Sequence, residues 1–138
     1  MSPAPFLLDT CAALWAVDDQ LSREASESLT ESYRAGQTTY VSPITAWEIG
    51  VLASRGRFRS TLAPQRWFHT LMQLPGMALA ELSVGVLFDS SCLPSAAPRD
   101  PADRIIIATA REYGYTVVTR DRAILDYANA GYLDALAC

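Results

Sequence analysis

Short apolar runs of four to six residues alternate with longer helical runs along almost the whole chain. The short runs are FLLD (6–9), TTYVS (38–42), MALAEL (77–82), TVVT (116–119) and YLDALA (132–137). The helical runs between them cover residues 11–17, 22–34, 43–55, 64–74, 84–93, 101–113 and 121–130. This alternation predicts an α/β fold, with a mainly parallel sheet covered by helices on both faces. Ligands of such sheets bind beyond the carboxyl ends of the strands.

The 138 residues contain no repeat and no long linker, which predicts a single domain over residues 1–138. No run approaches the roughly 18 apolar residues of a membrane span, and no basic region precedes the apolar segment at the N-terminus. We therefore expect a soluble, cytoplasmic protein without membrane association. The three cysteines lack metal-binding spacing, so we expect them to be reduced, with Cys11 packed in the core.

The basic side chains restrict the possible chemistry. All eleven are arginine, and the chain has a single histidine, His69. The absence of lysine excludes Schiff-base catalysis and P-loop phosphate binding, and one histidine excludes paired-histidine acid/base catalysis. We expect His69 to lie on a helix surface. The net charge of −4 argues against a generally basic nucleic-acid-binding surface, but fifteen carboxylates are enough to build a local cation site.

Carboxylates recur at one predicted edge of the sheet. Asp9 ends the first strand-like run, and Asp121 follows TVVT after one intervening residue. Asp100 and Asp103 open the helix that precedes TVVT, where Asp100 is a candidate N-cap and Asp103 lies in the first turn. Because the carboxyl ends of parallel strands share one edge, we expect these acids to face a common space.

Glu48 lies within or beside the apolar face of the helix after TTYVS. It stands four residues after Ile44 and four before Leu52, with Trp47 and Val51 alongside. A carboxylate in such a place is paired, protonated or bound to a metal ion. The alternative to a metal role is a salt bridge with an arginine such as Arg104 or Arg120.

Three segments carry a resemblance to a known family: FLLDTCAALWAV (6–17), SPITAWEIGVLASRGRF (42–58) and DPADRIIIATAREYGYTVVTRD (100–121). With them, and in the same order over nearly its whole length, the chain resembles PIN-domain proteins. Within that group it is similar to VapC-type toxins, the ribonucleases of bacterial toxin–antitoxin pairs. The resemblance implies a three-layer α/β/α sandwich.

The resemblance also implies a site. The acidic quartet of the family falls on Asp9, Glu48, Asp103 and Asp121, and Asp100 matches an additional acid that we treat as the N-cap and a secondary metal contributor. Thr10 and Thr119 match positions where the family often has a hydroxyl near the metal, and are candidate substrate-binding residues. Carboxylates without thiols or imidazoles suit Mg²⁺ or Mn²⁺. The implied reaction is metal-assisted hydrolysis of RNA, with Asp9, Glu48 and Asp103 as ligands and Asp121 supporting a second ion or the attacking water.

RNA must reach a negative pocket, so basic groups should flank it. Arg57 and Arg59 surround Phe58 in SRGRFRS, and we expect them to contact phosphates, although a solvated loop is an equal alternative. The resemblance further implies a homodimer and a cognate antitoxin bound in an apolar groove. Trp15, Trp47, Trp67 and Phe68 are expected in the core, with some available to line such a groove.

Other functions fit less well. A receiver domain uses a lysine that this chain lacks, and a haloacid-dehalogenase-type phosphatase needs an aspartate where Cys11 stands. A housekeeping PIN-domain RNA-processing nuclease and a PIN-fold binding module without turnover remain as alternatives.

Overall fold

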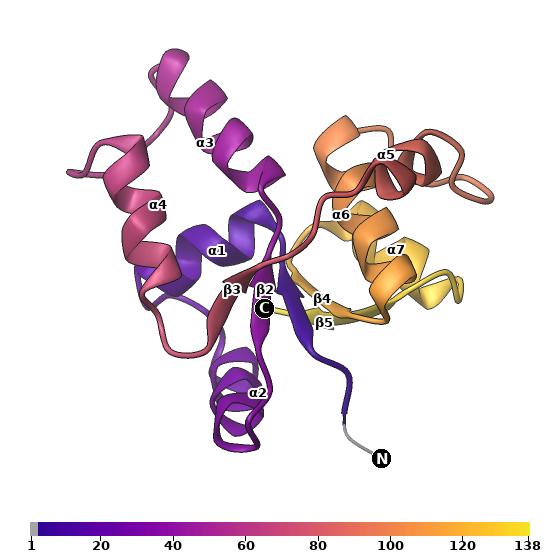
Figure 1. Ribbon diagram of the computed structural model, residues 1–138, viewed down its shortest axis with the longest axis horizontal. Coiled ribbons are helices and arrows are strands. Elements are labelled where there is room, and N and C mark those ends of the chain that lie inside the picture. Colours follow the sequence, from indigo (N-terminus) through magenta and orange to yellow (C-terminus); the bar gives the residue numbers. More distant parts are fainter. Residues whose placement is uncertain (1–2) are drawn as a thin grey trace.

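A computed structural model describes residues 3–138 and contains one five-stranded sheet (Figure 1). The strands are β1 (Phe6–Leu8), β2 (Thr39–Val41), β3 (Met77–Leu79), β4 (Thr116–Thr119) and β5 (Asp134–Ala137). Their order is β3-β2-β1-β4-β5, and every neighbouring pair is parallel. The earliest strand in the sequence thus lies at the centre.

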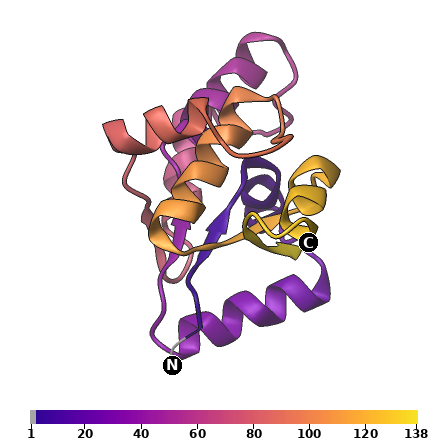
Figure 2. The same cartoon turned by 90° about the vertical axis from the view of Figure 1, so that its right-hand side faces the viewer.

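Helices cover both faces of the sheet. They are α1 (Thr10–Val17), α2 (Arg23–Arg34), α3 (Ile44–Ser54), α4 (Pro64–Met72), α5 (Val84–Ser91), α6 (Pro101–Tyr113) and α7 (Arg122–Asn129). The views in Figures 1 and 2 agree that α2 lies at the end of the molecule opposite to α3 and α5. The predicted α/β class and three-layer arrangement are confirmed.

Alternating strand residues divide the core into two parts, because successive side chains of a strand point to opposite faces. Leu8, Val41 and Val118 pack with α1 to α4, in the part that contains Trp67. Leu7 and Val117 pack on the other face with α6 and α7. Helix α5 lies outside and packs on α6. Among residues 3–138, no helix has the length and apolar character needed to cross a bilayer.

Gly114 ends α6 and sets the direction of the following strand. It adopts the left-handed conformation with φ of 73°, and its N–H donates to the carbonyl of Ala110. The chain reverses within two residues and enters β4. As a result, the first turn of α6, with Asp103, lies at the carboxyl edge of the sheet.

Two local predictions are wrong. The third strand ends at Leu79 rather than at residue 82, because Ser83 accepts the N–H of Val86 and begins α5. Cys11 is exposed and not in the core. Thr10, Ala12 and Ala13 are the buried positions of α1, so the helix turns Cys11 outward.

Candidate active site

The acidic residues meet where the strand order changes direction. From β1 the chain continues toward β2 and β3 on one side, and then crosses to β4 and β5 on the other. Asp9 follows β1, and Asp121 follows its neighbour β4, in which Val118 pairs with Leu8. This reversal point is the usual ligand position in open α/β sheets.

Three of the five predicted acids are also helix N-caps. An oxygen of Asp9 accepts the N–H of Ala12 at 2.8 Å, and Asp100 accepts that of Asp103 at 3.0 Å. Asp121 accepts the N–H of Ile124 at 3.2 Å. The positive ends of α1, α6 and α7 therefore point toward the cluster, which offsets part of the repulsion among the carboxylates.

Thr119 joins Asp9 to Asp121. Its hydroxyl donates to the second oxygen of Asp9 and accepts the backbone N–H of Asp121 at 3.0 Å. Thr119 is completely buried, and Asp9 is only 4% exposed. This buried position favours a role for Thr119 in orienting the acids over direct contact with a substrate.

Glu48 is held by a threonine and not by an arginine. The hydroxyl of Thr10 donates to Oε1 of Glu48. The two arginines proposed as salt-bridge partners bond elsewhere: Arg104 donates to the carbonyls of Ser90 and Pro98 at 2.8 and 3.0 Å, and Arg120 donates twice to that of Cys138. In the part of the chain that the structure describes, the ion pair is Arg23–Glu27. The salt-bridge alternative for Glu48 is therefore wrong.

Arg120 holds the segment between Thr119 and Asp121 in place. Its guanidinium lies 3.4 Å from the centre of the Trp15 ring, and its Nε and Nη2 bond to the Cys138 oxygen at 3.0 and 2.8 Å. The N–H of Cys138 in turn bonds to the carbonyl of Thr119 at 3.0 Å. This arginine is a structural anchor of the site.

Burial and the charge of neighbouring acids raise the pKa of Asp9, Glu48 and Asp103. Burial, followed by the charges of Asp100, Asp121, Glu48 and Asp9, raises the pKa of Asp103 to about 7. Burial also raises the pKa of Asp9 and of Glu48, while the hydrogen bonds from Thr119 to Asp9 and from Thr10 to Glu48 oppose the rise. All five acids therefore share one electrostatic environment, as the sequence predicted.

Cys11 borders this environment. Partial desolvation of its sulfur, followed by the charges of Asp9, Asp103, Glu48 and Asp121, raises its pKa to about 11. The thiol consequently stays protonated at neutral pH, and a protonated thiol is neither a strong nucleophile nor a good metal ligand.

The donors at the site are all carboxylate oxygens, which is the ligand chemistry of Mg²⁺ and Mn²⁺. Within residues 3–138, no three aspartate, glutamate, cysteine or histidine side chains lie close enough to hold one ion in this conformation. Closing the cluster on an ion would require rotation of at least one side chain. The raised pKa of Asp103 fits such a site, because a cation would relieve the crowding of negative charge.

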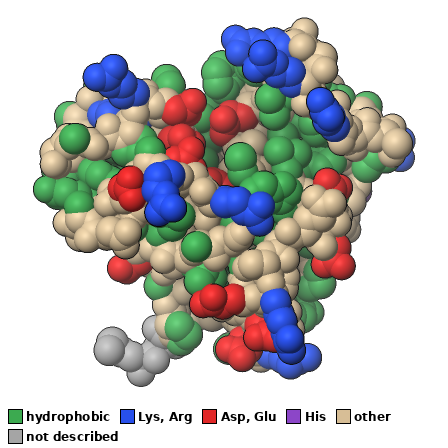
Figure 3. Space-filling model, turned by 180° about the vertical axis from the view of Figure 1, so that it is seen from behind, with side chains coloured by type: hydrophobic (Ala, Val, Ile, Leu, Met, Phe, Trp, Pro, Cys, Tyr) green, Lys and Arg blue, Asp and Glu red, His purple; other side chains and the backbone are tan. Residues whose placement is uncertain are grey.

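Arginines flank the acidic hollow. In Figure 3, acidic side chains gather between the two halves of the molecule, and arginines lie on both sides, most densely at the upper right. Arg57 and Arg59 are exposed in the loop after α3. Phe58 between them packs edge-on against Trp67, with ring centres 5.8 Å apart. Phe58 therefore anchors the loop and leaves both arginines free to face solvent.

The aromatic residues take different positions. Trp67 is in the core, Trp15 lies under Arg120, and Phe68 is half-buried. Trp47 departs from the core prediction, because 60% of it is exposed on α3, one residue before Glu48. His69 is exposed on α4, as predicted.

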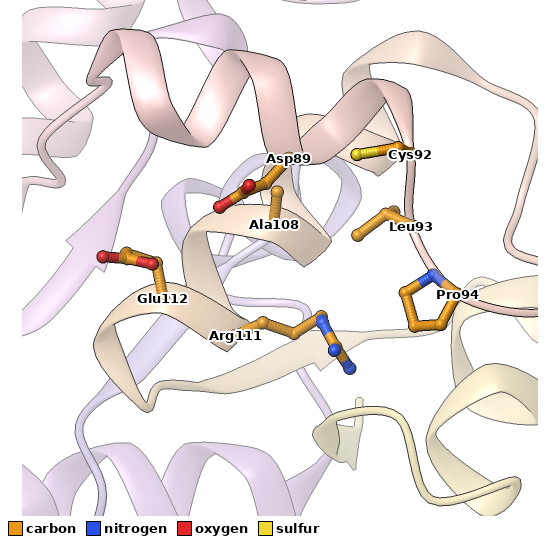
Figure 4. A pocket seen from close by; sticks show the side chains of 7 residues that line it. All are labelled: Asp89, Cys92, Leu93, Pro94, Ala108, Arg111 and Glu112. Carbon is orange, nitrogen blue, oxygen red and sulfur yellow. The ribbon is translucent and has the colours of Figure 1, made fainter.

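A pocket of about 290 Å³ lies between α5 and α6 (Figure 4). Its lining includes Asp89, Cys92, Arg111 and Glu112. Arg111 and Glu112 are in the last turns of α6, so this pocket is about 12 Å along the helix from Asp103. It is separate from the acidic cluster.

Sequence reasoning missed Thr45, whose hydroxyl lies 3.3 Å from that of Thr10. Its signal was present: Thr45 is a polar residue three positions before Glu48 on the same side of an apolar helix. Its partner, however, lies 35 positions away.

Comparisons with known proteins show the family and the fold to which this site belongs. Residues 6–130 match the PIN domain family. The chain is 32% identical to Ribonuclease VapC22 of Mycobacterium tuberculosis over 120 residues, 86% of this chain and 88% of that protein. Its fold is similar to that in promoter-DNA-bound VapBC2 from Rickettsia felis (TM-score 0.68, 16% identity, 96% and 97% of the two chains). It is also similar to that in DNA-bound VapBC from Salmonella typhimurium (TM-score 0.66, 17% identity, 98% of each chain).

Proposed function

Since the chain belongs to the PIN-domain family, we propose that it is a ribonuclease that hydrolyses RNA phosphodiester bonds with the help of Mg²⁺ or Mn²⁺. The observation that carries the proposal is the convergence of acids from four separate segments at one edge of the sheet. The pKa of Asp103 rises to about 7 partly because Asp100, Asp121, Glu48 and Asp9 all act on it. Carboxylates that served only as separate helix N-caps would not need to lie close enough together to raise the pKa of Asp103.

Each acid has a proposed role. Asp9, Glu48 and Asp103 would hold the ion, Asp121 would support a second ion or the attacking water, and Asp100 would contribute secondarily. When bound, the ion supplies a water of lowered pKa and positive charge for the phosphate. Thr119 and Thr10 orient Asp9 and Glu48 through the hydrogen bonds described above.

Substrate would enter from the side of the α3–α4 loop. Arg57 and Arg59 are exposed there, and each is able to bond a phosphate oxygen without disturbing the Phe58–Trp67 contact that anchors the loop. Local positive charge at the rim offsets the overall negative charge of the protein for an approaching RNA.

We further propose that the protein is the toxin of a toxin–antitoxin pair, acts in the cytoplasm, and forms a homodimer. The relative named Ribonuclease VapC22 and the VapBC assemblies support this role. Exposed apolar side chains on α3 and α5 support a protein partner: Trp47, Val84, Leu87 and Phe88. Growth arrest on expression, relieved by Asp9→Asn, is expected for a toxin and not for a housekeeping nuclease or a binding module.

RNA cleavage by the purified protein tests the reaction. We expect cleavage with millimolar Mg²⁺ or Mn²⁺ and none in excess EDTA. Asp9→Asn should abolish cleavage while keeping the N-cap of α1, because asparagine caps as well as aspartate. Asp134→Asn, an exposed change on β5, is the matched control and should cleave normally. Full activity in EDTA would contradict the metal mechanism, and full activity of Asp9→Asn would contradict the site.

A further inference from the structure

A chain of hydroxyl groups leads from Glu48 into the interior of the protein. The hydroxyl of Thr10 donates to Glu48, and its oxygen lies 3.3 Å from Oγ1 of Thr45. An ionised carboxylate only accepts hydrogen bonds, and a threonine hydroxyl has one proton. Because Thr10 gives its proton to Glu48, Thr45 must be the donor in the Thr45–Thr10 bond. The chain therefore runs in one direction, from Thr45 through Thr10 to Glu48.

Thr45 has little alternative to this bond. It is 0% exposed, and its hydroxyl has the Thr10 oxygen as its partner. Buried helical threonines commonly donate to the carbonyl four residues earlier, as Thr109 does to Ile105 at 2.7 Å. Thr45 is the second residue of α3, and the residue four positions before it, Val41, belongs to β2. The start of the helix thus leaves the Thr45 proton for Thr10.

We propose that Thr45 is a positioning residue for the acidic cluster. By donating to Thr10, it fixes the rotamer of Thr10 and directs the Thr10 proton to Oε1 of Glu48. The other oxygen of Glu48 is left out of this hydrogen bond and would be available to hold the cation. This inference rests on the proposed function, because it takes Glu48 to be a ligand of the metal ion.

The expected effect is a change in metal affinity. Removing a residue that orients a metal ligand usually weakens metal binding or activity by about 10- to 100-fold. Thr45 acts through one further hydroxyl, so we expect Thr45→Val to raise the Kd for Mn²⁺ by about 3- to 10-fold. Valine keeps the shape of threonine and removes only the hydrogen-bonding group.

Titration calorimetry with MnCl₂ on the full chain tests this expectation. Thr109→Val is the matched control, because Thr109 is also 0% exposed and bonds only within its own helix. Thr45→Val should bind Mn²⁺ more weakly than the wild type, Thr109→Val should bind equally well, and Thr45→Ser should restore the wild-type Kd. Equal Kd values for Thr45→Val and Thr109→Val would overturn the inference.

A double-mutant cycle separates a positioning role from general packing. In a Thr10→Val background, Thr45→Val should not weaken Mn²⁺ binding further, because its effect passes through Thr10. An equally large additional loss would overturn the inference. If Thr45→Val does not fold, Thr45→Ala and Thr45→Ser provide the same comparison, since they differ only in the hydroxyl. A wild-type protein that does not bind Mn²⁺, or an Asp9→Asn protein that binds it equally well, would instead overturn the proposed function.

Discussion

Replacing Asp103 by asparagine should stabilise the metal-free protein at alkaline pH. Burial and four neighbouring acids raise the pKa of Asp103 from 3.8 to about 7. An acid with a raised pKa binds its proton more tightly in the folded state. The free energy of unfolding therefore falls as pH rises from about 4 to about 7. Asparagine removes this loss and fills the same space.

The magnitude follows from two opposing effects. A rise from 3.8 to about 7, at roughly 1.36 kcal/mol per pKa unit, sets a ceiling of about 4 kcal/mol. Asp103 is only partly buried, so solvent and salt reduce this to about 1–2 kcal/mol. Loss of a negative charge from the first turn of α6 costs up to about 1 kcal/mol. We expect a net stabilisation of about 1 kcal/mol at pH 8.

Urea unfolding at pH 5 and pH 8 measures this difference. In EDTA, the wild type should be less stable at pH 8 than at pH 5, and Asp103→Asn should reduce that decline; Asp134→Asn, on β5, is the control. Saturating Mn²⁺ should stabilise the wild type by about 2.7 kcal/mol at 100 times its Kd, and the mutant by less. If Asp103→Asn lowers the free energy of unfolding by the same amount at both pH values, with and without Mn²⁺, the only role of Asp103 is to stabilise the first turn of α6.

Two further outcomes concern arginines. Changing Arg57 and Arg59 together to alanine should weaken RNA binding and reduce the slope of log K against log salt by up to about two, with little change in melting temperature. Filter binding at several salt concentrations measures the slope. A large loss of stability with an unchanged slope would show that both residues serve the fold. Arg104→Met should lower the free energy of unfolding by about 2–3 kcal/mol, because it removes charged hydrogen bonds to Ser90 and Pro98. The exposed Arg122→Met should cost under about 0.5 kcal/mol, and equal losses for the two variants in urea unfolding would refute this role.

Local rules were sufficient to predict where the acids lie. An aspartate directly after a parallel strand is both a common N-cap and a residue at the ligand-binding edge, so Asp9 and Asp121 could be placed from the order of the runs alone. Gly114 and the DPAD segment marked both ends of α6 correctly. The sheet and its two helical layers followed from the same alternation.

Features that depend on distant contacts were not predictable in this way. Helix α1 is apolar nearly all round, so its sequence has no periodicity to show that Cys11 faces outward. The flexible side chain of Arg104 can reach Glu48 or backbone carbonyls from the same position, and only the packed structure decides. Likewise, the exposure of Trp47 depends on the absence of a covering element above α3, which local sequence does not encode.

The central position of β1 has a consequence for the timing of folding. Asp9 is synthesised 110 residues before its partner Thr119, and β1 is likewise made long before β4, the strand beside it. At about 5–20 residues per second, roughly 6–22 seconds of translation separate the two halves of the acidic cluster. During that interval the nascent chain contains Asp9 but not yet Thr119 and Asp121. Under the proposed function, we therefore expect no RNA cleavage until β4 has been made and pairs with β1.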